Sequence, residues 1–156
     1  QPEQEPHPAL SSALTRLNRL EVTTVYPFLL NVYHDYARQT LTAPEFLKVL
    51  QTLESYLVRR FVCGAPTSEL NKIFPLLYRQ TQPQETTDFV SALKRTLQAK
   101  NYPSDAQFRA RLPTVKLYSK GAELVKHSSF GINRLRRPKN AKFRGAKCIL
   151  YFFSIS

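Results

Sequence analysis

Apolar residues recur every three or four positions through most of the first 110 residues, which is the period of an amphipathic helix. The longest such pattern runs from Thr42 to Val62, and its apolar residues occupy most of the helical circumference. A helix of this kind needs cover on several sides, so we expect it at the centre of a bundle. Its apolar positions are Phe46, Leu47, Val49, Leu50, Leu53, Tyr56, Leu57 and Phe61.

Both ends of this central helix carry recognisable signals. Thr42 is expected to cap the start, with Pro44 in the first turn and Glu45 completing a capping box. Gly64 is expected to end the helix in the left-handed conformation that glycine adopts most readily.

Shorter patterns predict further helices on both sides. The expected ranges are Ala9–Leu20, Tyr26–Arg38, Ser68–Arg79, Asp88–Lys100, a short helix after Ser104 and another that begins at Ala122. The expected starts are Ser11 or Ser12, Pro27 in a first turn, Thr67, Thr86 or Thr87, and Ser104. With only 4 Gly and short connections, the chain is predicted to be an all-α bundle of about six to seven helices. We expect residues 1–8 to be a linker, residues 9–126 the helical domain and residues 127–156 an irregular basic tail.

The net charge of +12 is unevenly distributed along the 156 residues. Residues 1–110 hold 12 Lys and Arg against 10 Asp and Glu, a net charge of +2. Residues 111–156 hold 11 Lys and Arg against Glu123 alone, a net charge of +10. Such a basic segment suits phosphates, an acidic partner or an anionic membrane surface, and a solvated tail is the alternative.

Candidate contacts to the nucleic-acid backbone lie in both parts of the chain. In the helical part they are Arg59, Arg60 and Lys72, and in the tail they are Arg134, Arg136, Arg137, Lys139, Lys142 and Arg144. Arg59 and Arg60 point about 100° apart on a helix, so they do not form a single clamp. One interpretation is a phosphate contact or a docking point for another domain. The other is packing between helices, with hydrogen bonds to carbonyl groups or to Glu69.

The chain shows no recognisable catalytic centre or cofactor motif. His34 and Asp35 are adjacent and face different directions on a helix, and no nucleophile accompanies them. Cys63 and Cys148 lack metal-site spacing, so we expect free thiols in a reducing cytoplasm. The longest apolar run, Cys148 to Phe153, is too short to span a membrane. We therefore expect a cytoplasmic, non-enzymatic chain with no cofactor and no membrane partner.

Three segments carry a resemblance to a known family. Residues Leu53 to Phe74 closely resemble the helical middle of the GmrSD-type, modification-dependent restriction enzymes of bacteria. Tyr102 to Phe108 resembles the family's aromatic-Pro-Ser-Asp-x-x-Phe helix start, and Leu117 to Lys120 is a third similar stretch. The resemblance covers roughly residues 10–126. In that family a ParB-like nucleotide-using domain precedes the helical part and an HNH nuclease domain follows it. The resemblance therefore implies a connecting domain in a phage-defence system, with DNA cleavage carried out elsewhere.

Two other functions remain open from the sequence. One is a self-standing helical protein that binds nucleic acid through residues 111–147, and the other is an adaptor with an exposed apolar groove. The tail itself departs from the family, whose members continue with a long glutamate-containing helix, whereas residues 124–156 contain no acidic residue. We therefore hypothesise a disrupted reading frame near His127, which sequencing of the encoding DNA would test. The absence of an initiator methionine indicates a processed, trimmed or excised chain.

Overall fold

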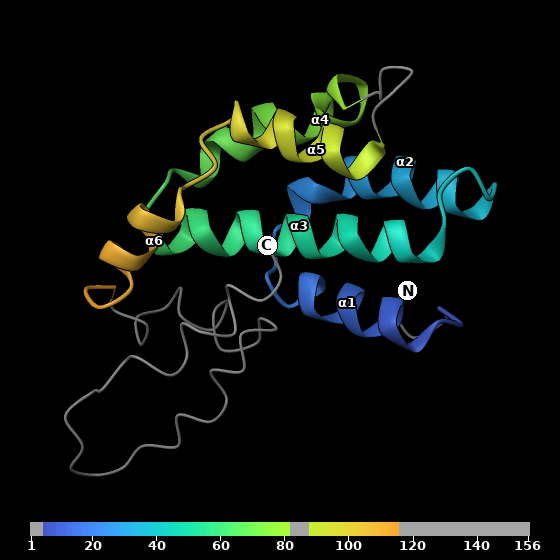
Figure 1. Ribbon diagram of the computed structural model, residues 1–156, viewed down its shortest axis with the longest axis horizontal. Coiled ribbons are helices and arrows are strands. Elements are labelled where there is room, and N and C mark those ends of the chain that lie inside the picture. Colours follow the sequence, from blue (N-terminus) through green and yellow to red (C-terminus); the bar gives the residue numbers. More distant parts are fainter. Residues whose placement is uncertain (1–4, 82–87, 116–156) are drawn as a thin grey trace, which may run out of the picture.

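A long helix, α3 (Ala43–Val62), runs through the middle of the described part of the molecule, and the other α-helices described there lie around it (Figure 1). The computed structural model describes residues 5–81 and 88–115. These residues form no strand, which confirms the predicted all-α class. The remaining elements are α1 (Pro8–Asn18), η2 (Thr23–Val25), α2 (Tyr26–Ala37), η3 (Thr67–Glu69), α4 (Leu70–Gln80), α5 (Phe89–Gln98) and α6 (Asp105–Arg111).

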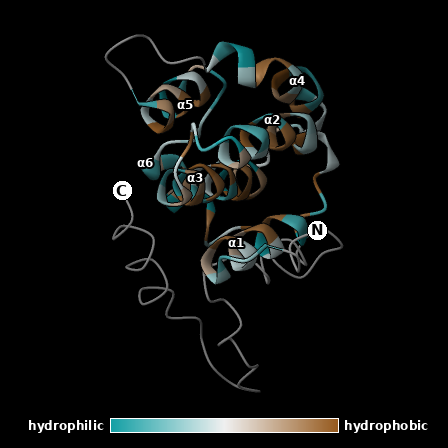
Figure 2. Ribbon diagram, turned by 90° about the vertical axis from the view of Figure 1, so that its right-hand side faces the viewer, coloured by the Kyte–Doolittle hydropathy of each residue, from teal (hydrophilic) through white to brown (hydrophobic). Residues whose placement is uncertain are grey.

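The helices form layers on two sides of α3. α1 packs on one side, while α2 and α5 contact the other side and α4 packs on α2 (Figure 2). α6 lies at the C-terminal end of α3. Phe46, Val49, Leu53 and Tyr56 of α3 are fully buried. The apolar circumference of α3 is thus covered from several directions, as its sequence predicts.

Both predicted ends of α3 are confirmed. The Thr42 hydroxyl accepts a hydrogen bond from the Glu45 backbone N–H (3.4 Å), and a Glu45 carboxylate oxygen accepts one from the Thr42 N–H (2.8 Å). The hydrogen bonds that the Thr42 hydroxyl and the Thr42 N–H donate to the Glu45 carboxylate lower the pKa of Glu45. At the other end Gly64 has φ of +72°, and the Ala65 N–H donates to the Arg60 carbonyl (2.9 Å). That pattern is the Schellman motif, which reverses the chain direction directly after α3.

Some predicted helix starts are wrong. Thr67 does not cap α4, because residues Thr67–Glu69 form a 3-10 turn that Leu70 follows as the first residue of the α-helix. α5 is capped by Asp88, whose carboxylate accepts from the Ser91 N–H at 2.7 Å. An Asp cap is at least as favourable as a Thr cap. The predicted caps Thr86 and Thr87 lie outside the described residues.

The N-terminal boundary also differs from the prediction. α1 begins at Pro8, which takes the first helical position where a missing N–H costs nothing, so Ser11 and Ser12 lie inside the helix. Glu5, expected in a linker, is buried, and its carboxylate accepts hydrogen bonds from the hydroxyls of Tyr33 (3.1 Å) and Tyr36 (3.4 Å). Burial, together with this carboxylate, raises the pKa of both tyrosines. Residues 5–8 therefore belong to the folded body.

One further predicted helix start is confirmed, and two other predictions concern residues that the structure does not describe. Ser104 caps α6 as expected, and Gln107 completes a capping box with it. The helix expected from Ala122 and the predicted tail lie outside the described residues. Within residues 5–81 and 88–115, no helix has the length and apolar character needed to cross a membrane.

Candidate nucleic-acid interface and the buried arginine pair

The two arginines singled out by the sequence lie in the last turn of α3, immediately before the Schellman motif. Both residues are buried, with Arg59 6% exposed and Arg60 2% exposed. Because neighbouring helical residues point in different directions, each guanidinium reaches a different part of the fold. Their surroundings decide between the two interpretations drawn from the sequence.

Arg60 joins two segments that follow α3. One of its terminal nitrogens donates to the Pro66 carbonyl (3.0 Å) and to the Glu69 carboxylate (2.6 Å). The other donates to the backbone carbonyls of Lys100 (3.3 Å) and Asn101 (3.4 Å). The hydrogen bond from Arg60 lowers the pKa of Glu69. Arg60 therefore holds the loop after Gly64 and the connection between α5 and α6 at one point.

Arg59 holds the start of α6. Its guanidinium donates to the Pro103 carbonyl (3.2 Å) and lies 2.5 Å from the Asp105 carboxylate in an ion pair. The same group is 5.5 Å from the ring centroids of Tyr102 and of Phe108, a distance at which cations and aromatic rings attract. The first turn of α6 is thus fixed to the end of α3 by charge, hydrogen bonding and ring contact together.

This arrangement supports the structural interpretation of the pair, including the contact with Glu69. A guanidinium that leaves a carboxylate and several carbonyls to reach a phosphate would strand those groups without donors. Neither side chain has the exposure that a phosphate contact requires. The interpretation of Arg59 and Arg60 as nucleic-acid contacts is therefore corrected to a role in fixing loops to α3.

The remaining candidate contacts are Lys72 and six residues of the predicted tail. Lys72 is exposed on α4, so it remains accessible to a phosphate. The tail candidates lie outside the described residues; they are Arg134, Arg136, Arg137, Lys139, Lys142 and Arg144. Of the nine proposed contacts, only Lys72 is placed by the structure on an open surface.

Glu54 is a buried charged residue that was not among the candidates predicted from the sequence. Glu54 is 3% exposed on α3, and its carboxylate lies 3.3 Å from the Nε of Arg16 on α1. Glu54 lies five and six residues before Arg59 and Arg60, which is not a favourable pairing distance on a helix. A carboxylate on a helix that is expected to be covered on several sides was itself a signal, since a buried charge needs a partner. The partner could not be named because it lies 38 residues away.

Asp35, Cys63 and possible metal ligands are the remaining candidates for chemistry among the described residues. Asp35, considered with His34, accepts a hydrogen bond from the Tyr78 hydroxyl at 2.6 Å. Burial raises the pKa of the Cys63 thiol, which disfavours the thiolate. Across residues 5–81 and 88–115, no three His, Cys, Asp or Glu side chains gather in a way that could hold a metal ion. The charged groups at the end of α3 hold helices in place.

No known protein family, curated protein or solved structure matches this chain. The GmrSD-type resemblance is therefore a prediction from the amino-acid sequence alone.

Proposed function

We propose that this chain is the helical connecting domain of a GmrSD-like modified-DNA restriction enzyme in bacterial phage defence. Its role is to position a ParB-like nucleotide-using domain and an HNH nuclease domain, while both chemical steps occur outside it. The domain itself is non-catalytic and cytoplasmic, and its partners are those two domains and the DNA backbone.

The observation that carries this proposal is the contact between the two main resembling segments. Arg59 belongs to the segment from Leu53 to Phe74, and all of its partners described above belong to the segment from Tyr102 to Phe108. These segments are 44 residues apart along the chain at the hydrogen bond to Pro103. The resemblance thus involves one structural unit, the junction of α3 with α6.

The positions of the first and last described residues suit a spacer. Glu5 packs on Tyr33 and Tyr36, which in turn contact Phe46 near the start of α3. α6 packs at the opposite end of α3 (Figure 1). A helix of 20 residues is roughly 30 Å long, so α3 would hold the preceding and following domains about that far apart.

Sequencing the DNA on both sides of the encoded segment tests the proposal. A ParB-like domain in frame upstream and a nuclease domain downstream would support it, even if a frame disruption near residue 127 separates the second. An isolated full-length gene with neither domain would contradict it. The purified chain is expected to show neither nuclease nor nucleotidase activity. Metal-dependent DNA cleavage that disappears on a point substitution within this chain would overturn the assignment.

The charge distribution favours a second candidate, a self-standing protein that binds nucleic acid through its basic C-terminal part. Because Arg59 and Arg60 are buried, the net charge of +10 in residues 111–156 is the main source of phosphate affinity. Binding would be independent of base sequence, and each neutralised phosphate would add about −0.9 to the log–log salt slope. A chain that ends at Ala110 should lose this binding. If it binds duplex DNA as tightly as the full chain, the site lies on the helical body and Lys72 becomes the first residue to mutate.

A further inference from the structure

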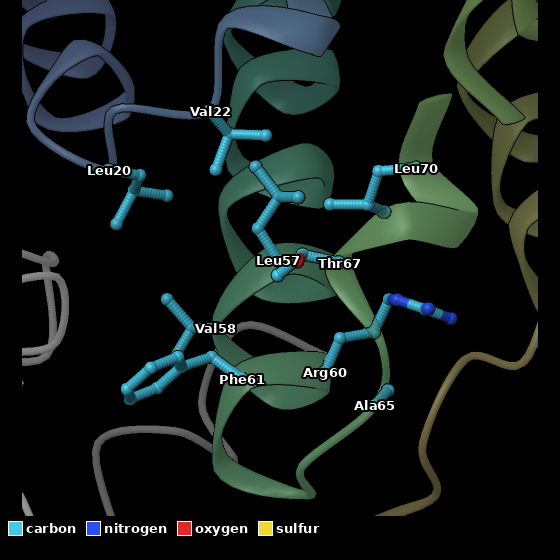
Figure 3. A pocket seen from close by; sticks show the side chains of 9 residues that line it. All are labelled: Leu20, Val22, Leu57, Val58, Arg60, Phe61, Ala65, Thr67 and Leu70. Atoms are coloured by element: carbon cyan, nitrogen blue, oxygen red, sulfur yellow. The ribbon is translucent and has the colours of Figure 1, made fainter. Parts of the chain in front are cut away.

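A small apolar pocket lies on α3 beside the connection from α1 to α2 (Figure 3). Its volume is about 40 Å³, and Leu20, Val22 and Leu57 are among the side chains that line it. Ligand pockets usually measure about 300–1,000 Å³, so this one is too small to be a ligand site by itself. A broader apolar surface in this region is the outward face of α2, which begins directly after the same connection.

The outward face of α2 carries a row of exposed side chains with large apolar surfaces. Tyr26, Leu30 and Tyr33 are 43%, 71% and 42% exposed. They stand at i, i+4 and i+7, so they lie in one row along the helix. A surface helix ordinarily presents charged side chains on this face. From residue 22 to residue 37, however, the only Asp, Glu, Lys or Arg is Asp35, which accepts a hydrogen bond from Tyr78 of α4. Aromatic residues without charges are typical of the centre of a protein interface.

Two hydrogen bonds fix the tyrosines of this row. The Tyr26 hydroxyl donates to the side-chain oxygen of Asn18 (2.8 Å), and the Tyr33 hydroxyl donates to the Glu5 carboxylate (3.1 Å). Leu30 lies between the two rings and is the most exposed of the three side chains. Because the rings are held before any partner arrives, ordering them on association costs little entropy.

The charges at the two ends of the row favour a second copy of this protein as the partner. Glu21 lies nine residues before Leu30, and Arg38 lies eight residues after it. Both are exposed, and neither forms an ion pair with another described residue. If two copies of α2 pack antiparallel with Leu30 at the twofold axis, Glu21 of each copy meets the partner's Arg38. The same arrangement places Tyr26 against the partner's Tyr33.

We propose that α2 is the interface of a weak, twofold-symmetric homodimer, in which the rows of Tyr26, Leu30 and Tyr33 pack on one another. A helix of 12 residues is about 18 Å long, so the contact is far smaller than the roughly 800 Å² per partner of a stable dimer. Association therefore requires a high protein concentration. Arg19, two residues before Glu21, is exposed as well, so the charges set the orientation of the copies more than the strength of their contact.

The positive net charge of the chain is compatible with this contact. Residues 1–110 carry a net charge of only +2, and most of the positive charge follows them. The basic segment begins at Arg111 in α6, which packs at the C-terminal end of α3. Tyr33, in contrast, contacts Phe46 near the start of α3. At about 0.15 M salt, charges more than about 8 Å apart are largely screened. Repulsion between the basic segments is therefore reduced at this ionic strength.

Sedimentation velocity of the full chain tests the proposal, with a reducing agent present to prevent disulfides. The mean sedimentation coefficient should rise toward that of a dimer between about 10 and 500 µM protein. Leu30→Asp places two carboxylates at the twofold axis and should keep the protein monomeric over this range. Ala106→Asp is the matched control, because it adds the same charge at an exposed position of α6 and should leave dimerisation unchanged. A monomeric wild type would leave the α2 face to a different partner and overturn the proposal, and so would a dimer that survives Leu30→Asp.

An exchange of charges tests the antiparallel arrangement. Glu21→Arg and Arg38→Glu each bring like charges together at both ends of the interface, and each should weaken the dimer about tenfold. The double variant restores opposite charges and should recover the dissociation constant of the wild type. Failure of the double variant to recover association would overturn the proposed packing. None of these results bears on the connecting role proposed above, which the DNA on both sides of the encoded segment tests separately.

Discussion

The two halves of α3 hold their neighbours in different ways. The first half contacts its surroundings through fully buried apolar side chains such as Phe46, Val49 and Leu53. The last turn contacts them through two buried guanidinium groups, each directed at carbonyls and a carboxylate. Apolar contact is non-directional, so it stabilises a helix against α3 without fixing the path of a loop. Hydrogen bonds from a planar guanidinium depend on distance and direction, so they do fix that path.

This difference explains where irregular chain is found. The Gly64 loop, η3 and the connection from α5 to α6 all meet at the C-terminal end of α3, where the arginines are. Irregular segments have backbone carbonyls without partners in a helix or a sheet, and Arg60 supplies donors to three of them. The first half of α3 faces regular helices, whose carbonyls are already paired. The arginines therefore lie where neighbouring backbone carbonyls require hydrogen-bond donors.

The largest effect should come from the apolar half. Leu53 is completely buried, so Leu53→Ala removes apolar contact and leaves a cavity, with a loss of roughly 2–5 kcal/mol in the free energy of unfolding. The measurement is a denaturant melt of the full chain. A loss below about 1 kcal/mol would mean that the surrounding helices collapse into the space, contrary to the tight packing described here.

In the charged half, Arg60→Met should lower the free energy of unfolding by about 3 kcal/mol, because Glu69 and three carbonyls lose their donor. Methionine keeps a long apolar stem, which isolates the loss of the guanidinium. The control is Glu69→Gln, which keeps an acceptor on a side chain that is 40% exposed and should cost far less. Similar losses for the two variants would show that the ion pair matters more than the carbonyl contacts.

The turn at Gly64, which follows α3, should give a smaller effect that arises from backbone conformation alone. A Cβ at Gly64 would meet no atom within 4 Å beyond the adjacent residues of the chain, so contact of that atom with the rest of the fold adds no cost. Gly64→Val should still cost about 1–2 kcal/mol because φ is +72°, a region that β-branched residues avoid. Gly64→Asn is the control and should cost less, since asparagine tolerates the left-handed region. Equal melts for valine and glycine at this position would contradict the Schellman assignment.

The smallest expected effect is a dependence on pH. The folded state lowers the pKa of Glu69 below its ordinary value of 4.5, mainly through the hydrogen bond from Arg60. The contribution of Glu69 is therefore fully present above pH 4.5 and is lost as the pH falls through the lower folded value. The difference in stability between wild type and Glu69→Gln should narrow as the pH falls from 6 to below 4.5. A difference that stays constant over this range would show that the charge on Glu69 contributes nothing.

The sequence predicted the apolar half of α3 better than the charged half, for a physical reason. Helical periodicity, the Thr42 capping box and the Gly64 stop are local signals, and all three are confirmed. The partners of Arg59 and Glu54 are 44 and 38 residues distant, so no local pattern identifies them. The Glu69 contact was anticipated because it lies only nine residues from Arg60. Thr67 failed as a cap since the chain makes a 3-10 turn that brings Glu69 to that arginine.

The account depends most on Arg59, which is held to fix α6 to the end of α3. Amide hydrogen exchange in the full chain tests this directly, with Arg59→Met compared with wild type. Arg16→Met is the matched control, because Arg16 forms an ion pair with Glu54 at a different contact, the one between α1 and α3. Arg59→Met should remove protection from α6 while the amides of α1 and α2 keep theirs, and Arg16→Met should leave α6 unchanged. Unchanged protection of α6 in Arg59→Met would contradict the claim that this arginine positions the chain that follows.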